Sequence, residues 1–105
     1  MYSLAELLRQ YAKSRPESLC IAFDGEFISF AELDKRSDRL VSVLLGQGLV
    51  AGDRVAILAT NKPAFFELLF ACAKSGLIML PINWRLSARE IGAIIVDASP
   101  RCILS

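Results

Sequence analysis

Two short polar groups, each following an apolar segment, are the residues best placed to do chemistry in this sequence. If both apolar segments are strands of one parallel sheet, the polar groups lie together at its carboxyl edge. Open α/β sheets bind their ligands at that edge. We therefore treat the groups as candidate edges of a ligand site. They are Thr60, Asn61 and Lys62 after the first segment, and Asn83, Trp84 and Arg85 after the second.

These residues also have a purely structural interpretation. Asn61 is suited to cap a helix whose first turn contains Pro63, because a missing N–H is harmless there. Trp84 would then cover apolar surface, and Arg85 would form a surface ion pair. Both interpretations stay open at this point. Neither assigns a catalytic, cofactor-binding or metal-binding residue within residues 1–105.

The glycines of segment 46–52 do not match a dinucleotide-binding fingerprint. Three residues separate Gly48 from Gly52, whereas the fingerprint has two at that place. The segment also follows a predicted helix and precedes a predicted strand, and phosphate binding requires the reverse order. The segment is therefore predicted to be a helix stop and a turn. A small nucleotide-binding domain is the least favoured function considered.

Composition restricts the class of protein. A chain of 105 residues is one domain or part of one. Apolar residues make up 54%, above the usual ~45–50% of globular proteins, which suggests a heavily covered sheet or a part of something larger. The net charge is +1 and no basic stripe is present, so we expect no nucleic-acid partner. Segment 64–82 is apolar, but Glu67, Lys74, Gly76 and Pro81 interrupt it, so we expect no membrane span.

The cysteines indicate a reduced, cytoplasmic protein. Cys20, Cys72 and Cys102 are an odd number, are widely separated, and lie inside apolar runs. A reduced thiol in such a run behaves as a small apolar side chain. The sequence contains no histidine and no close cysteine pair, so we expect no metal site.

Three Ser-x-x-Glu patterns predict three helix starts. In this capping box the serine and glutamate side chains bind each other's backbone N–H groups. An apolar pair that can act as a hydrophobic staple brackets each pattern: Tyr2 with Leu7, Ile28 with Leu33, and Leu86 with Ile91. The three pairs are Ser3 and Glu6, Ser29 and Glu32, and Ser87 and Glu90.

The periodicity predicts an α/β fold. It is a partial, doubly wound, mostly parallel sheet with helices on both faces, preceded by a helix and a β-hairpin with Asp24-Gly25 at its turn. Its first strand–helix–strand unit should have a right-handed crossover. The predicted helices cover 4–13, 30–45, 64–75 and 88–98, and the predicted strands cover 19–23, 26–28, 55–59, 77–82 and 101–105.

The apolar spacing also predicts which side chains are buried. The helix at 64–75 is apolar almost all round, so it needs neighbours on both sides. The charges at Lys35, Arg36, Asp38 and Arg39 look like a solvated face. Leu4, Leu7, Leu8 and Tyr11 lie on one face of the first helix, which is the spacing of a half-buried helix. Residues expected to be buried are Leu33, Ser37, Leu40, Val41 and Leu44 in the second helix, and Ile91, Ile94 and Ile95 in the last.

The final strand is reached at the last residues of the sequence, which suggests a chain cut out of something longer. Such a piece would leave apolar surface and an open sheet edge uncovered. We therefore expect the isolated chain to self-associate, by edge pairing or by exchange of elements between copies.

Several segments, in this order and spacing, resemble the N-terminal portion of the AMP-forming acyl-CoA synthetases, also called adenylate-forming ligases. The resemblance runs nearly end to end, and implies that residues 1–105 are a fragment of the large N-terminal domain of such an enzyme. The segments are Arg15-Pro16-Glu17, 28–34, Arg39-Leu40, 52–58, Asn61 with Pro63, Gly76, and 81–87.

The resemblance implies a reaction in which ATP activates a carboxylic acid to an acyl-adenylate, and a thiol, usually coenzyme A, then takes the acyl group. ATP, Mg²⁺ and coenzyme A are therefore implied for the parent enzyme and none for this chain. In that family catalysis needs a Ser/Thr/Gly-rich phosphate loop with a lysine, later nucleotide-binding motifs, and a lysine in a small C-terminal domain. The sequence has none of these motifs, so no catalytic residue is carried over.

Two functional hypotheses follow. In the first, the chain is an N-terminal structural portion of such a ligase and is inactive alone, with the rest of the ligase as its partner. In the second, it is a stand-alone, non-enzymatic α/β module that docks on a partner through its apolar helix. The sequence does not specify the carboxylic acid or the thiol acceptor of the parent.

Overall fold

The computed structural model describes residues 3–23, 26–58, 63–83 and 85–104. The tip of the predicted hairpin, Asp24-Gly25, lies outside these residues. Helices and strands alternate much as the periodicity predicts. In chain order they are α1 (Leu4–Ser14), β1 (Leu19–Phe23), β2 (Glu26–Ser29), α2 (Phe30–Gly46), β3 (Arg54–Ile57), α3 (Pro63–Ser75), β4 (Ile78–Pro81), α4 (Ala88–Ala98) and β5 (Cys102–Leu104).

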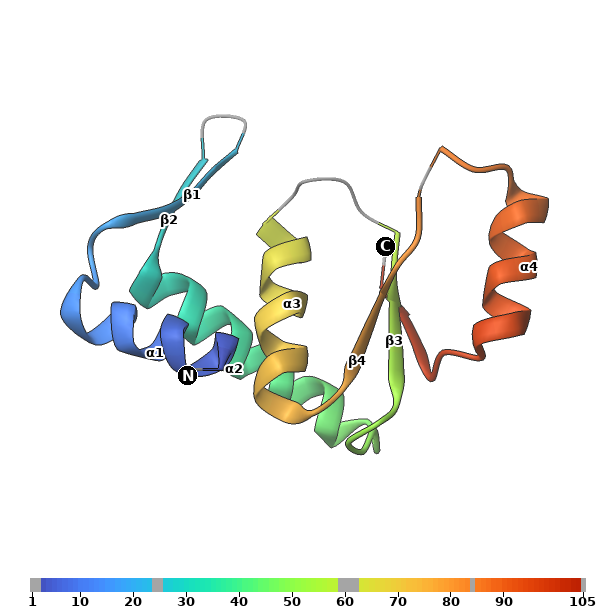
Figure 1. Ribbon diagram of the computed structural model, residues 1–105, viewed down its shortest axis with the longest axis horizontal. Helices are drawn as coiled ribbons and strands as arrows, with labels where there is room; N and C mark the ends of the chain where they lie inside the picture. Colours follow the sequence, from blue (N-terminus) through green and yellow to red (C-terminus); the bar gives the residue numbers. More distant parts are fainter. Residues whose placement is uncertain (1–2, 24–25, 59–62, 84, 105) are drawn as a thin grey trace.

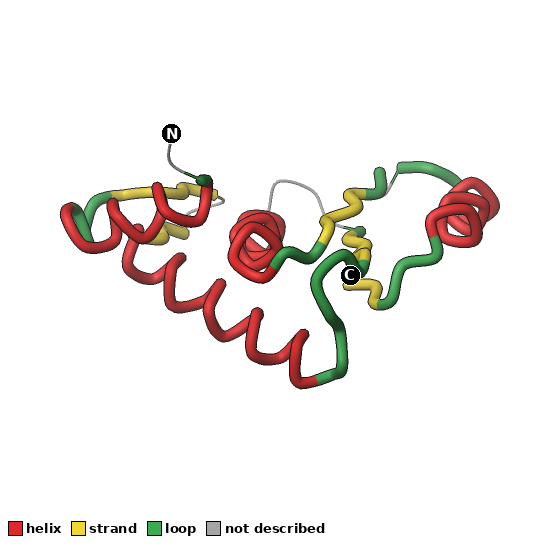
Figure 2. The backbone as a smooth tube through the Cα atoms, turned by 60° about the horizontal axis from the view of Figure 1, so that its bottom comes forward, coloured by secondary structure: helices red, strands yellow, loops and turns green. Residues whose placement is uncertain are grey.

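The central element is a three-stranded parallel sheet with β3 in the middle, in the order β4-β3-β5. Helices α3 and α4 lie on opposite sides of this sheet (Figures 1 and 2). From β3 the chain crosses one face of the sheet through α3 to reach β4. It then crosses the other face through α4 to reach β5. This arrangement confirms the predicted doubly wound α/β fold. The strands β1 and β2 form a separate antiparallel hairpin beside α1 and α2.

The helix starts confirm two of the three predicted capping boxes. At α1 and α4 both halves of the box are present, Ser3 with Glu6 and Ser87 with Glu90. At α2 only Glu32 N donates to Ser29 Oγ, at 3.1 Å. The reciprocal half is not formed, because the Glu32 carboxylate turns along α2 and binds arginine instead. That prediction was wrong in this respect.

Glycines with left-handed backbone conformations follow the helices α2 and α3. Gly76, directly after α3, has a φ of 78°. A Cβ at this position would lie 3.1 Å from the Cβ of Ala51, so only glycine suits both the backbone and the space. Gly48 and Gly52 both have a φ of 93°. Segment 46–52 is thus a helix stop and a turn rather than a nucleotide loop.

Helix α3 lies between two apolar clusters. On one side Leu68 and Cys72 join β3 in the larger cluster, which also contains Leu44, Leu49, Val55, Ile57 and Leu77. On the other side Phe66 and Phe70 pack against the smaller cluster of Leu8, Ile28 and Leu33. The prediction that this helix needs neighbours on both sides is confirmed. Helix α3 is therefore the element that joins the sheet to α1, α2 and the hairpin.

The burial of α4 was predicted wrongly, and that of α1 is limited to part of its apolar face. In α1 only Leu8 is buried, whereas Leu4, Leu7 and Tyr11 are 39–43% exposed. Helix α4 has no fully buried residue, and its isoleucines are only half-buried. The physical reason for α4 is that only one of its sides faces the sheet (Figures 1 and 2). Helix α1 packs against α2 and α3 through part of its apolar face. In α2 the prediction holds for Leu33, Ser37 and Leu44, while Leu40 and Val41 are half-buried.

Among the described helices, none combines the length and the apolar character that crossing a membrane would require.

Candidate functional site

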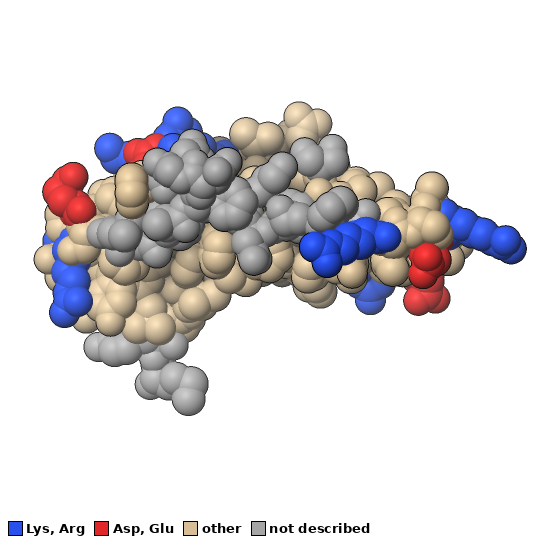
Figure 3. Space-filling model, turned by 90° about the horizontal axis from the view of Figure 1, so that it is seen from above, with Lys and Arg blue, Asp and Glu red and all other residues tan. Residues whose placement is uncertain are grey.

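The carboxyl ends of β3 and β4 point to the face that Figure 3 shows from above. The predicted site residues Thr60, Asn61, Lys62 and Trp84 lie outside the described residues, so their roles stay predictions. Of the others, Asn83 and Arg85 are exposed, and Asn83 Oδ1 accepts a hydrogen bond from Arg85 N at 3.0 Å. Asn83 therefore orders the turn before α4. In the view of Figure 3 the described charged side chains occur in small groups and not as one patch.

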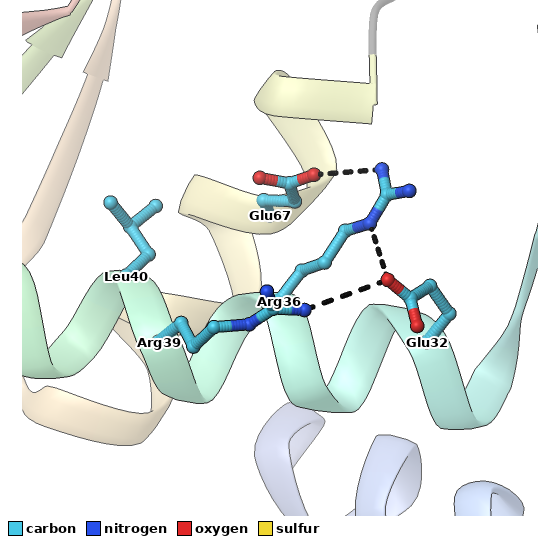
Figure 4. A pocket seen from close by; sticks show the side chains of 5 residues that line it. All are labelled: Glu32, Arg36, Arg39, Leu40 and Glu67. Carbon is cyan, nitrogen blue, oxygen red and sulfur yellow. Dashed lines mark hydrogen bonds and ion pairs between the residues drawn. The ribbon is translucent and has the colours of Figure 1, made fainter.

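An open depression of about 420 Å³ lies between α2 and α3. It is lined by Glu32, Arg36, Arg39, Leu40 and Glu67 (Figure 4). A second depression of about 460 Å³ lies next to it, and Glu32 lines both. The charges in the first depression are paired with one another. The second is lined by Glu17, Phe27, Ser29 and Glu32.

Arg36 connects the two helices that form this depression. Its Nε lies 2.9 Å from Glu32 Oε1 on α2, and its Nη1 lies 3.3 Å from Glu67 Oε1 on α3. Arg39 Nη2 adds a longer contact of 3.6 Å to the same Glu32 oxygen. The hydrogen bond from Arg36 holds the pKa of Glu32 below its usual value. Since the guanidinium is occupied by two carboxylates, it has a structural role and is not a free anion site.

A pH-dependent contribution to stability follows from the lowered pKa of Glu32. The unfolded state binds more protons below about pH 4.5, so the stabilisation is present above that value and is lost as pH falls through the folded-state pKa. We expect Glu32→Gln to lose less thermal stability than the wild type between pH 7 and pH 3. Thermal melts at both pH values measure this difference.

The matched control is Glu17→Gln, which changes an exposed carboxylate with no ion pair among the described residues. It should keep the wild-type dependence on pH. If Glu32→Gln and Glu17→Gln respond equally to acid, the ion pair with Arg36 does not stabilise the fold.

A second ion cluster surrounds Lys74 of α3. The Lys74 side chain is only 7% exposed, and its Nζ lies 2.6 Å from Asp34 Oδ1 and 2.8 Å from Asp38 Oδ1 on α2. The same Nζ donates to Ser37 Oγ at 2.7 Å. Arg9 Nη2 of α1 lies 3.1 Å from Asp38 Oδ1. The cluster therefore joins α1, α2 and α3.

Sequence reasoning missed both ion clusters. Arg36 and Asp38 were predicted to belong to a solvated face, but each pairs with a residue of α3. The sequence did contain one signal for the Lys74 cluster. Asp34 and Asp38 are four residues apart on the same helix, and Ser37 lies on the apolar face of that helix. This pattern does not identify the cation that binds the two aspartates until α3 is placed against α2. The charged groups of each cluster bind one another.

The described thiols lie in the apolar packing of the fold. Cys72 and Cys102 are free, and Cys72 is buried. Burial raises the pKa of Cys72 to about 11, so it stays protonated at neutral pH and is a poor nucleophile. Both cysteines belong to the apolar packing around β3. The side chain of Cys20 lies outside the described residues.

Known proteins are similar to this chain in sequence over nearly its whole length. The family model described as AMP-binding enzyme matches residues 8–105. A fatty acid–[acyl-carrier-protein] ligase of Streptomyces coeruleorubidus is 33% identical over 103 residues, which are 98% of this chain and 20% of that protein. A feruloyl-CoA synthase of Amycolatopsis is 34% identical over 93 residues, 89% of this chain and 19% of that protein. The chain thus spans about a fifth of the length of these relatives.

Solved structures agree with the sequence comparison. A protein described as a long-chain-fatty-acid CoA ligase from Rhodopseudomonas palustris has a TM-score of 0.91 and 37% identity, covering 97% of this chain and 26% of that one. The N-terminal subdomain of Klebsiella oxytoca NpsA, solved with anthranilyl-AMSN, has a TM-score of 0.88 and 27% identity. That match covers 98% of this chain and 27% of the subdomain. From the family match over nearly its whole length, this chain belongs to the AMP-binding enzyme family of acyl-CoA and acid ligases.

Proposed function

We propose that this chain is the N-terminal structural portion of an ATP-dependent, AMP-forming carboxylic acid:CoA ligase, and that it is inactive without the rest of that enzyme. The match over residues 8–105, which takes in about a fifth of each long relative, carries this proposal. The match to part of an N-terminal subdomain supports the position in the parent.

In this proposal the parent enzyme performs two steps. The acid's carboxylate attacks the α-phosphorus of ATP, which forms an acyl-adenylate and releases pyrophosphate. The thiol of coenzyme A then attacks the acyl carbon, and AMP leaves. ATP, Mg²⁺ and coenzyme A belong to the parent. The free thiols Cys72 and Cys102 support a reduced, cytoplasmic setting.

In this proposal the chain is a structural framework of the parent enzyme. Helix α3 joins the sheet to α1, α2 and the hairpin through two apolar clusters and two ion clusters. The charged groups of both ion clusters are occupied by one another. The framework would thus place the carboxyl edge of the sheet, and residues supplied elsewhere in the parent would carry out the chemistry.

The full-length parent tests this proposal. We expect it to exchange labelled pyrophosphate into ATP only when a suitable carboxylic acid is added, and to form an acyl thioester when coenzyme A follows. A panel of short-chain, long-chain and aromatic acids identifies the substrate. Deleting residues 1–105 should abolish both activities. A parent without any acid-dependent exchange across the panel would contradict the proposal.

The second hypothesis, a stand-alone module that docks through its apolar helix, is less favoured by the packing. None of the large apolar side chains of α3 is exposed in the described part of the chain. An open reading frame that ends after residue 105 would favour this hypothesis instead. Self-association of the isolated chain stays a proposal, and light scattering at rising concentration tests it.

A further inference from the structure

We propose that two copies of the protein pair through the outer face of α4, with the two helices antiparallel and Ala93 at the centre of the contact. This inference rests on the proposed function only because it takes the full-length parent as the molecule that pairs. Two observations support it. The exposed side chains of α4 are arranged symmetrically about Ala93, and two of them carry charges that the helix itself disfavours.

Helix α4 turns one face away from the sheet. In Figures 1 and 2 no other described element lies beyond this face. Among its side chains, Val96 is 80% exposed. The outer positions of this face lie three or four residues before or after Ala93, so they surround it on the same side of the helix. After the first residue of α4 the exposed positions are Arg89, Glu90, Ala93, Val96 and Asp97.

Arg89 and Asp97 lie where the dipole of α4 disfavours their charges. Arg89 is the second residue of the helix, and Asp97 is the last but one. The N-terminus of a helix carries partial positive charge and the C-terminus partial negative charge, so each side chain is repelled by the end on which it lies. Neither side chain has an ion-pair partner among the described residues. The cation that binds the C-terminus of α4 is Arg54, whose Nη1 donates to Ala98 O at 2.7 Å.

An antiparallel second copy supplies the missing partners. When a two-fold axis passes between the two Ala93 residues, each residue faces the one at the same distance on the other side of Ala93. Arg89 of one copy is then level with Asp97 of the other, about 6 Å along the helix from Ala93 at 1.5 Å per residue. The symmetry forms this ion pair twice. Glu90 does not compete for Arg89, because its Oε1 accepts a hydrogen bond from Ser87 N at 3.2 Å.

The centre of this face suits close packing of two helices. Ala93 has a small side chain, so the helix axes can approach to about 8 Å, the short end of the usual range. Val96 lies beside Ala93 and would pack on the aliphatic part of Arg89 of the second copy. The contact therefore covers the most exposed large apolar side chain among the described residues.

A second copy fits this face better than a membrane or the interior of the parent. The face carries three charged side chains and a single large apolar one, so it lacks the apolar area that either of those would cover. Self-complementary charge is what a two-fold contact between identical molecules requires. One pair of 11-residue helices is smaller than the roughly 1,600 Å² of a standard interface. The pairing is therefore weak and depends on concentration.

Exchanging the charges tests the pairing in the full-length parent, by sedimentation equilibrium at rising protein concentration and low salt. We expect the wild type to form dimers. Arg89→Asp places two aspartates opposite each other, and Asp97→Arg places two arginines opposite each other. Each variant alone should associate about tenfold more weakly, because two attractive contacts become repulsive. An equimolar mixture of the two variants has opposite charges at both contacts, and should associate like the wild type.

The matched control is Lys35→Asp, which reverses an exposed charge on α2 and should associate like the wild type. A thermal melt checks that each variant folds. A wild-type parent that stays monomeric at every concentration would overturn the proposal. So would single variants that associate as strongly as the wild type, or a mixture that associates no better than its two components. Acid-dependent pyrophosphate exchange by the wild-type parent reports separately on the proposed function, so the two can fail independently.

Discussion

Replacing Lys74 with methionine is expected to lower the free energy of unfolding by about 3 kcal/mol. Methionine keeps most of the length of the side chain but removes the ammonium group. Asp34, only 19% exposed, would then keep a single distant cation, Arg9 at 3.9 Å. The buried hydroxyl of Ser37 would lose the hydrogen bond from Lys74 as well. A charge left partly buried without its partner costs more than the pair gained.

Urea unfolding measured by circular dichroism gives this difference. The control is Lys35→Met, because Lys35 is an exposed lysine of α2 and its replacement should change stability by less than about 0.5 kcal/mol. Similar effects of the two substitutions would mean that the Lys74 cluster does not join the helices.

The second large effect is expected from Leu68→Ala, again about 3 kcal/mol. Leu68 is 0% exposed and lies in the larger cluster, where α3 packs against the sheet. Truncation removes apolar contacts and leaves a cavity that the surrounding strands cannot fill without moving. Because α3 also holds the smaller cluster, a loosened α3 weakens the attachment of α1 and the hairpin.

The same unfolding experiment tests this substitution. Val43→Ala on α2 is the control, because Val43 is 58% exposed and its truncation should cost little. If Leu68→Ala loses no more stability than Val43→Ala, then α3 is not the element that joins the sheet to the other helices.

Local signals predicted most of the fold. Helix α4 begins and ends as its capping serine and the following proline indicate, and the start of α2 is marked by Ser29. The alternation of strands and helices predicted the doubly wound fold class. It was recognisable because each apolar run was short and bounded by turn residues. The extent of burial on α4 was not predicted correctly. Apolar periodicity shows which face of a helix is turned inward, but not how much of that face its neighbours cover.

The candidate site was predicted less well than the fold, for a physical reason. The ion cluster around Lys74 depends on residues about forty positions apart, and only the packing of α3 on α2 brings them together. The prediction for Ser29 and Glu32 was also incomplete, although these two residues are close in the sequence. The capping box they match is only half formed, because Arg36 and Arg39 compete for the glutamate.

In the proposed function this chain is a framework, and the reactive groups lie elsewhere in the parent. The most direct test is ATP–pyrophosphate exchange by the purified 105-residue chain alone, with Mg²⁺ and the acid that the parent uses. We expect no exchange above the protein-free background, because the reactive groups lie elsewhere in the parent. Acid-dependent exchange by this chain on its own would contradict it.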